Sequence, residues 1–190
     1  MTEITYSQIG QDLFVKNTLK NKIGGLFLDI GGGPPKFINN TYLLEKQYGW
    51  NGISIDMSQE YCKMWKDSDR NTKFILGDAT TIDYNIILSE FQDVYGTNRI
   101  DYLSMDLEPP IFTLNALLKI PFDEFKFSVI TYETDMYRDP IINGEGIDKL
   151  YTSIKSREVF EKYGYKLVFS NNQEDWWVNA DLYKDGVLNG

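Results

Sequence analysis

Short apolar segments that each end at an acidic residue recur through much of this chain. The acids are Asp29, Asp56, Asp78, Asp106 and Glu133, which lie 22 to 28 residues apart. That spacing has room for one strand and one helix, and strands connected in this way run parallel. In open sheets of this kind, ligands bind outside the carboxyl ends of the strands. The pattern therefore predicts an α/β fold with carboxylates along one edge of a mostly parallel sheet.

The expected secondary structure follows the same alternation. Strands are predicted over residues 26–30, 52–55, 72–76, 100–105, 126–133 and 165–169, with a last strand around 176–178. Helices are predicted over residues 6–20, 40–48, 58–67, 84–91, 112–118 and 148–163. The first helix is amphipathic, and its expected buried positions are Ile9, Leu13, Phe14 and Leu19. Residues 134–147 show no periodicity and predict a long loop at the carboxyl edge.

Composition restricts the classes of function. The 190 residues suit a single domain over 1–190, with residues 1–22 as an N-terminal helical cap segment. The net charge of −9 argues against a nucleic-acid partner, because phosphate contacts need clusters of Lys and Arg. With Cys62 as the only cysteine, no secretory signal and no membrane span, we expect a cytoplasmic protein. The absence of histidine excludes Ser-His-Asp and Cys-His catalysis and histidine-ligated zinc.

Three loops carry residue types that suit a nucleoside. Gly31–Gly33 follow the first strand, where glycines let a backbone approach a ligand, although such a run also forms ordinary turns. Asp56 ends the second strand, where related folds bind ribose hydroxyls; alternatively, it flanks the helix that begins near Ser58. Asp78 can reach an adenine amino group, or it can close an Asx turn.

Eight segments, in order, resemble the FkbM-type S-adenosylmethionine-dependent methyltransferases. They are SQIGQD (7–12), LDIGGGPP (28–35), NNTYLLEK (39–46), GWNGISID (49–56), GDAT (77–80), DYLSMDLE (101–108), ITYET (130–134) and EDWWVN (174–179). The resemblance implies a Rossmann-like class I methyltransferase fold: a seven-stranded, mostly parallel sheet with strand 7 antiparallel and helices on both faces. It also implies O-methylation of a small-molecule or glycan acceptor, most often a sugar hydroxyl, with S-adenosylmethionine as cofactor.

The resemblance also assigns roles to residues. Asp106, Glu108 and Glu133 fall at the methyl-transfer point and are the expected catalytic residues. The expected cofactor-binding residues are Gln8, Gln11, Asp29, Gly31, Gly32, Asp56, Met57, Asp78, Ala79 and Asp106.

Three positions depart from the family pattern. Pro35 and Pro109 stand where the family usually has glycine, and Thr134 stands where it commonly has histidine. Proline fixes φ and has no N–H donor, so both loops must differ in shape from those of relatives. The milder interpretation is a stiffened loop that still binds the cofactor. The harsher one is an impaired cofactor site. We favour the first because the surrounding acids are all present. A separate alternative, also consistent with the two prolines, is a catalytically impaired nucleoside-binding module that keeps the nucleoside pocket.

Two mechanisms suit the acids that follow the fourth and fifth strands. In the favoured one, Asp106 or Glu133 acts as a general base without a metal. In the other, Asp106, Glu133 and Asp135 bind Mg²⁺ through their oxygens. A structural alternative is that these acids cap helices or pair with Lys126 or Arg138.

Two further alternatives concern the tail and the cofactor. Trp176 and Trp177 could line the acceptor site together with Tyr137, but packing of the last strand is the simpler interpretation. A nicotinamide-dependent oxidoreductase is disfavoured, because Lys36 occupies the third glycine position of a G-x-G-x-x-G pattern that begins at Gly31.

Overall fold

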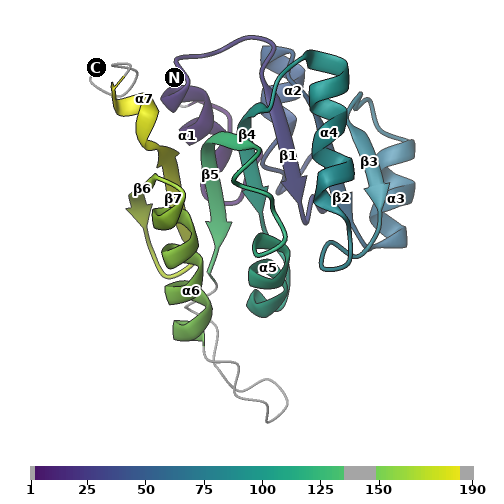
Figure 1. The fold of residues 1–190 in the computed structure, drawn as a ribbon. Coiled ribbons are helices and arrows are strands. Elements are labelled where there is room, and N and C mark those ends of the chain that lie inside the picture. The colour runs from purple at the N-terminus through teal and green to yellow at the C-terminus, as the bar shows by residue number, and fades with distance from the viewer. Residues whose placement is uncertain (1–2, 135–148, 185–190) are drawn as a thin grey trace.

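A mostly parallel sheet forms the centre of the molecule. The computed structural model describes residues 3–134 and 149–184. Within them, seven strands lie in the order β3-β2-β1-β4-β5-β7-β6 (Figure 1). The strands are β1 Leu26–Ile30, β2 Asn51–Asp56, β3 Lys73–Leu76, β4 Arg99–Met105, β5 Lys126–Glu133, β6 Tyr165–Ser170 and β7 Glu174–Asn179. β7 is antiparallel to both of its neighbours, as predicted.

Helices cover both faces of the sheet (Figure 1). Their bounds are α1 Gln11–Thr18, α2 Tyr42–Tyr48, α3 Gln59–Lys66, α4 Tyr84–Tyr95, α5 Pro110–Leu117, α6 Lys149–Lys162 and α7 Ala180–Lys184. Side chains of α4, α5 and α6 join the larger core on one face. Those of α1, α2 and α7 join a second core on the other face. Across the two described stretches, none of the helices is both long and apolar enough to cross a bilayer.

Local signals in the sequence account for most element ends. Ser58 caps α3 by accepting a hydrogen bond from the Tyr61 amide at 3.2 Å, as expected from its position. Gly49 ends α2 in the left-handed region with φ 65°. The predicted strands 26–30 and 126–133 are confirmed without change. The predicted loop 134–147 lies outside the described residues except for Thr134.

The first helix is shorter than predicted and turns a different side toward the core. It begins at Gln11 rather than residue 6, because the Asp12 carboxylate binds the preceding segment through Thr5 Oγ1, the Tyr6 amide and Ser7 Oγ. The predicted buried positions Ile9, Leu13, Phe14 and Leu19 are each only partly buried. The buried residues are Gln11, Asp12, Val15, Lys16 and Thr18. Apolar periodicity missed this side because most of its buried positions are polar and are satisfied by specific partners.

Toward the carboxyl ends of the strands, the face under α1 and α2 changes from apolar to polar. Strand register aligns Phe27, Tyr102, Val129 and Val178 in an apolar row. Two residues further toward the carboxyl edge, the register aligns Ser54, Asp29, Ser104, Thr131 and Trp176. Because side chains in a strand alternate between faces, this second row lies on the same face as the first. We call the second row the polar row.

Asp29 lies in the polar row between Ser54 and Ser104 and is 1 % exposed. Its Oδ2 accepts hydrogen bonds from Ser54 Oγ at 3.1 Å and from Thr41 Oγ1 at 3.4 Å. Burial raises the pKa of Asp29 to about 6, although the charge of Arg70 and hydrogen bonds from Ser104 and Ser54 oppose that rise. The ionised carboxylate is therefore held inside the protein at a cost in stability.

Replacing Asp29 by asparagine removes this cost. Since the pKa is higher in the folded state than the ordinary value of 3.8, Asp29 lowers the stability progressively as the pH rises from about 4 to about 6. We expect Asp29→Asn to raise the free energy of unfolding by up to about 3 kcal/mol near pH 7.5. Near pH 4 the gain should fall below about 1 kcal/mol. Urea unfolding at both pH values measures this difference.

The exposed Asp93 of α4 offers a matched control. Asp93→Asn removes the same charge at the surface and should change stability little at either pH. A gain for Asp29→Asn that is equal at the two pH values contradicts the explanation by buried ionisation.

Candidate functional site

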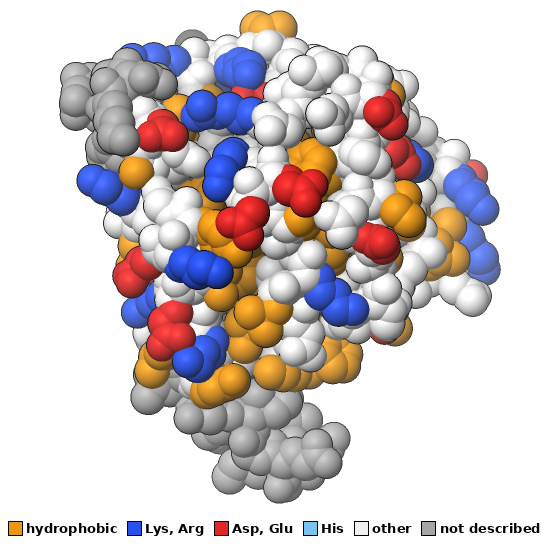
Figure 2. Space-filling model, viewed as in Figure 1, with side chains coloured by type: hydrophobic (Ala, Val, Ile, Leu, Met, Phe, Trp, Pro, Cys, Tyr) orange, Lys and Arg blue, Asp and Glu red, His pale blue; other side chains and the backbone are white. Residues whose placement is uncertain are grey.

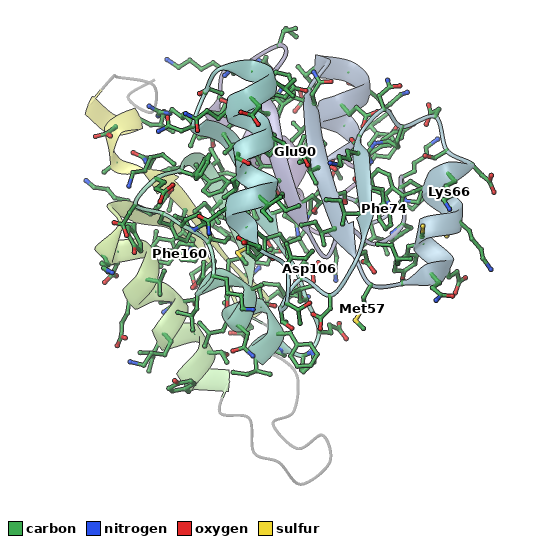
Figure 3. The ribbon with its side chains drawn as sticks, turned by 45° about the vertical axis from the view of Figure 1, so that its right-hand side comes forward. Met57, Lys66, Phe74, Glu90, Asp106 and Phe160 are labelled. Carbon is green, nitrogen blue, oxygen red and sulfur yellow. The ribbon has the colours of Figure 1, made fainter. Side chains whose placement is uncertain are left out.

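A third row of residues forms the carboxyl edge itself. Two positions beyond the polar row in each strand stand Asp56, Gly31, Asp106, Glu133 and Glu174. The Asp106 amide donates to the Ile30 carbonyl at 2.9 Å, which keeps the loop after β4 beside β1. Met105 pairs with Tyr132, so Asp106 and Glu133 follow at the ends of neighbouring strands. Figure 3 shows Met57 and Asp106 at this same edge. The fold thus brings together the predicted acids of β2, β4 and β5.

Close contacts within the protein require glycine at two of the three positions after β1. Gly31 has φ 83°, and a Cβ there would lie 1.8 Å from the Asp106 carbonyl oxygen. A Cβ on Gly32 would lie 1.9 Å from Ser54 Oγ in the polar row. Gly33 has φ 54°, and a Cβ there would meet nothing within 4 Å, so Gly33 alone of the three borders open space. The contacts of Gly31 and Gly32 press the turn of the loop onto the sheet.

Asp56 connects this loop to the end of β2. Its Oδ2 accepts the Gly33 amide at 3.0 Å, and its Oδ1 accepts the Ser58 amide at 2.8 Å. The contact with Gly33 orients Asp56 toward residues 31–35, which we call the glycine loop. The contact with Ser58 is the helix-flanking role considered from the sequence. A carboxylate has about four acceptor positions, and Asp56 is only partly buried. It therefore retains acceptor capacity for the hydroxyl groups of a ligand, and the adjacent Met57 is 67 % exposed.

Asp78 adopts the Asx turn that the sequence offered as an alternative. Its Oδ1 accepts from the Thr80 amide at 2.8 Å and from Thr80 Oγ1 at 2.7 Å. These hydrogen bonds hold the pKa of Asp78 below its usual value. The side chain is exposed after the outermost strand, whereas Ala79 is buried and its carbonyl accepts from Tyr84 at 2.9 Å. Whether Asp78 reaches an adenine ring stays a prediction.

Asp29 and Gln11 lie below the surface of the site. Asp29 belongs to the polar row and lies beneath Gly32, where its carboxylate supports the loop, and its contact with a cofactor stays a prediction. Gln11 is 1 % exposed, and its amide donates to the Glu174 carboxylate and accepts from the Ile9 amide. Gln11 therefore joins the N-terminal segment to β7. Gln8 is exposed.

The remaining predicted residues have mixed surroundings. Glu108 is exposed and precedes α5, whose first turn is held by Thr113 Oγ1 bonded to the backbone of Leu107. Glu133 is 7 % exposed and lies opposite Glu174.

Trp176 is buried against Phe14, with ring centroids 4.6 Å apart. This confirms the packing interpretation for Trp176, and Trp177 is likewise buried at 1 % exposure.

Two sequence alternatives for the acids are not supported. Lys126 lies at the amino end of β5 and donates to the Phe122 carbonyl, so pairing between Lys126 and the acids at the opposite edge is wrong. Among residues 3–134 and 149–184, no group of three acidic or cysteine side chains is placed to hold a metal ion. Asp135 and Arg138 lie outside those residues. The magnesium alternative therefore gains no support.

Sequence patterns missed the side chains that hold the glycine loop. Asn39 Nδ2 donates to the carbonyls of Gly32 and Pro34 at 2.9 and 3.0 Å. Trp65 Nε1 donates to the Gly33 carbonyl at 2.8 Å. Arg70 donates to the Pro35 carbonyl at 2.7 Å. Only Asn39 falls within a family-like segment, and Arg70 lies alone in an irregular stretch that has no pattern to mark it.

Comparison with known proteins identifies the fold and goes no further. No protein-family model and no curated protein matches the chain. Among solved structures, one described as an rRNA methylase from Clostridium thermocellum is 14 % identical, with a TM-score of 0.56 over 93 % of this chain and 96 % of that one. A SAM-dependent methyltransferase from Aquifex aeolicus is 17 % identical, with a TM-score of 0.51 over 88 % of each chain.

The small RNA methyltransferase HEN1 is 11 % identical, with a TM-score of 0.58 over 96 % of this chain but 28 % of that chain. At such low identities the similarity establishes a shared fold. The chain has the Rossmann-like fold of class I methyltransferases, as the sequence predicted.

Proposed function

We propose that this chain is an S-adenosylmethionine-dependent O-methyltransferase of the FkbM type, with a hydroxyl of a sugar or glycan as acceptor. The observation that carries the proposal is the hydrogen bond from the Gly33 amide to Asp56. It joins the glycine loop after β1 to the acid that ends β2. The strand order reverses between β1 and β4, and the crevice at such a point is where nucleosides bind in open α/β sheets.

The residues at this edge fit an adenosyl cofactor. Asp56 has acceptor capacity for two ribose hydroxyls, and Gly33 leaves open space beside it. Exposed Met57 offers an apolar surface of the kind on which a flat base can rest. When bound, S-adenosylmethionine supplies a methyl group on a positively charged sulfur. A nearby carboxylate such as Asp106 favours a positive charge.

Asp106 and Glu133 are the proposed proton acceptors. A sugar hydroxyl is a very weak acid, so its oxygen needs a base to take its proton as it becomes a nucleophile. The two carboxyl groups follow paired residues at the ends of β4 and β5, so either can face the same acceptor hydroxyl. Glu133 is nearly buried, which limits competition from water for that proton.

The charge distribution favours a small or glycan acceptor over nucleic acid. In the face shown in Figure 2, Lys and Arg are interspersed with Asp and Glu instead of forming a basic patch. Together with the net charge of −9, this offers little attraction for a phosphate backbone. The RNA substrates named for two proteins of the same fold therefore do not transfer to this chain in the proposal.

A second candidate is a nucleoside-binding module without catalysis. The observation that favours it is Pro109, which follows Glu108 directly at the start of α5 and changes the loop beside the predicted methyl-transfer point. The two candidates share cofactor binding and differ in turnover.

Cofactor binding can be tested through Asp56. We expect the wild-type chain to bind S-adenosylhomocysteine in a calorimetric titration. Asp56→Ala should weaken that binding roughly 10- to 100-fold, because it removes charged acceptors for ribose hydroxyls. Asp93→Ala, at the exposed position on α4, should leave the affinity unchanged. Binding of NAD by a chain that binds no S-adenosylhomocysteine would contradict the proposal and revive an oxidoreductase.

Catalysis can be tested through the two proposed bases. With S-adenosylmethionine labelled on its methyl group and a panel of glycans, we expect Asp106→Asn or Glu133→Gln to lower turnover about 100-fold or more. S-adenosylhomocysteine affinity, measured in parallel, separates a lost base from lost binding. Turnover should survive thorough chelation of divalent ions. Full turnover by both variants rejects the carboxylate base, and wild-type binding without any turnover selects the binding module.

A further inference from the structure

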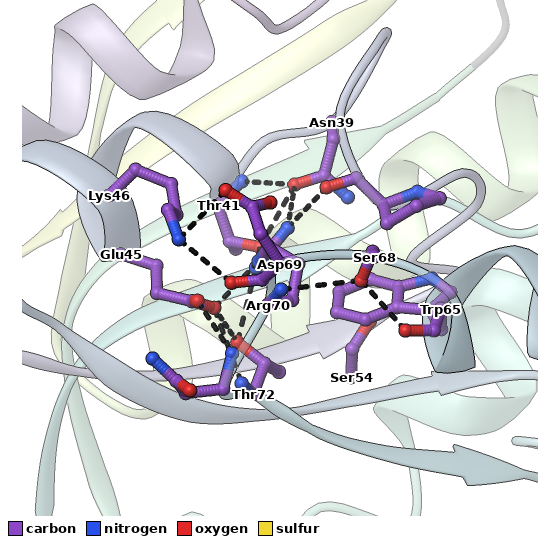
Figure 4. Close-up of polar contacts among 12 residues, drawn as sticks. Asn39, Thr41, Glu45, Lys46, Ser54, Trp65, Ser68, Asp69, Arg70 and Thr72 are labelled. Atoms are coloured by element: carbon purple, nitrogen blue, oxygen red, sulfur yellow. Dashed lines mark hydrogen bonds and ion pairs between the residues drawn. The ribbon is translucent and has the colours of Figure 1, made fainter.

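We infer that Arg70 is a positioning residue that holds the glycine loop in the shape that receives the cofactor. This inference rests on the proposed function and extends it to a residue outside the row of acids at the carboxyl edge. Arg70 lies in the irregular segment between α3 and β3, and its side chain is fully buried. Figure 4 shows it at the centre of a group of polar contacts.

The guanidinium group of Arg70 uses its whole donor capacity. Nε donates to Glu45 at 2.6 Å. Nη1 donates to the Pro35 carbonyl at 2.7 Å and to Asn39 Oδ1 at 3.1 Å, and Nη2 donates to Thr41 at 2.9 Å and Thr72 at 3.1 Å. Five N–H groups thus meet five acceptors, which come from the loop after β1, from α2 and its N-cap, and from the residue before β3. A buried charge of this kind is stable only when it is so completely bonded.

Arg70 belongs to a larger set of side chains that bind the carbonyl groups of the adjoining loop. Four consecutive carbonyl groups, from Gly32 to Pro35, each accept a side-chain hydrogen bond. Their donors are Asn39 for Gly32 and Pro34, Trp65 for Gly33 and Arg70 for Pro35. Arg70 also orients the other two donors, because it binds Asn39 Oδ1 and lies 4.5 Å from the Trp65 ring centroid.

Because side chains hold the carbonyl groups of this loop, the orientation of its amide groups is fixed as well. Pro34 and Pro35 have no N–H, so the loop offers only the three glycine amides. Those of Gly31 and Gly32 donate to the Ile55 carbonyl at 2.9 and 3.1 Å, and that of Gly33 donates to Asp56. Gly33 therefore orients Asp56 directly, and the side chains bound to the carbonyl groups fix the loop that carries Gly33. If Arg70 no longer bonds to the loop, Gly33 and Asp56 lose their fixed separation.

The pKa of Glu45, the acid paired with Arg70, indicates that both side chains are charged. Burial acts to raise the pKa of Glu45, but the hydrogen bond from Thr72 and the charge of Arg70 outweigh it and hold that pKa below its usual value. Lysine keeps the positive charge of Arg70 but has three donors at one point, and so it cannot span Pro35, Asn39 and Thr72 together. Arg70→Lys therefore removes geometry while it retains charge.

The test compares Arg70→Lys with Arg157→Lys in the full chain. Arg157 makes a similar forked ion pair, with buried Asp175 at 2.7 and 2.9 Å, far along the sheet on α6. We expect both variants to melt at lower temperature than wild type. Only Arg70→Lys should weaken S-adenosylhomocysteine binding, by about 10-fold or more. It should also speed amide hydrogen exchange in peptides that cover residues 28–41, and Arg157→Lys should leave that region unchanged.

Asn39→Asp provides a second route if Arg70→Lys does not fold. It keeps the Oδ1 acceptor for Arg70 and removes the Nδ2 donors to Gly32 and Pro34. Weaker binding with faster exchange over residues 28–41 again supports the inference. Lower stability with unchanged affinity in these variants overturns it and leaves Arg70 a purely structural residue.

The exchange measurement also separates this inference from the proposed function. If wild type binds no S-adenosylhomocysteine, the proposed function fails. Exchange that rises over residues 28–41 in Arg70→Lys then still supports a loop positioned by Arg70, while unchanged exchange there overturns the positioning role as well.

Discussion

The chain that leaves β1 has to bury several carbonyl groups before it reaches α2, and buried carbonyls need donors. The loop itself cannot provide them, because two of its residues are prolines. The donors come from Asn39, from Trp65 of α3 and from Arg70 beyond α3. This requirement couples the first three strand–helix units. The position of Gly33, its bond to Asp56 and the shape of the carboxyl edge follow from it.

The same requirement gives a physical meaning to Pro35. The FkbM-type family that the sequence resembles usually has glycine at this place, and a proline here suggests either a stiffened loop or an impaired cofactor site. Here the Pro35 carbonyl is bound by Arg70, and the preceding Pro34 carbonyl is bound by Asn39. A fixed φ suits a loop whose neighbouring carbonyl groups are already held, because less conformational entropy remains to be lost. These contacts favour the interpretation of a stiffened loop over that of an impaired one.

The polar row beneath the edge connects stability to the site. Ser54, Asp29 and Ser104 occupy positions where apolar side chains would pack more favourably, and Asp29 is held there at a raised pKa. Proteins accept such costs most often where a polar group supports function. Gly32 rests directly on this row, so the row supports the glycine loop from below.

A fold shared with methyltransferases does not identify the acceptor of the methyl group. The proposal of a glycan acceptor depends on the family-like segments and on the charge distribution.

The sequence alone determined the order of elements from α1 to β7 and the edge at which the acids gather; it did not predict α7. Apolar runs ending at Asp29, Asp56, Asp106 and Glu133 carry that information locally, because strand length and spacing are properties of neighbouring residues. The same local reasoning correctly located Ser58 as a helix cap.

Only the tertiary structure decided the depth of each acid and the supports of the loop. Asp29 and Asp56 follow similar apolar runs, yet one is buried under Gly32 and the other is only partly buried, since their depth depends on which strands and loops lie across them. Arg70 and Gly33 are 37 positions apart in the chain, and no periodicity relates them. The burial of Gln11 in α1 likewise depends on a distant partner, Glu174 of β7, which no local pattern marks. Local patterns specify elements, whereas the pairing of buried polar groups is settled only when the whole chain has packed.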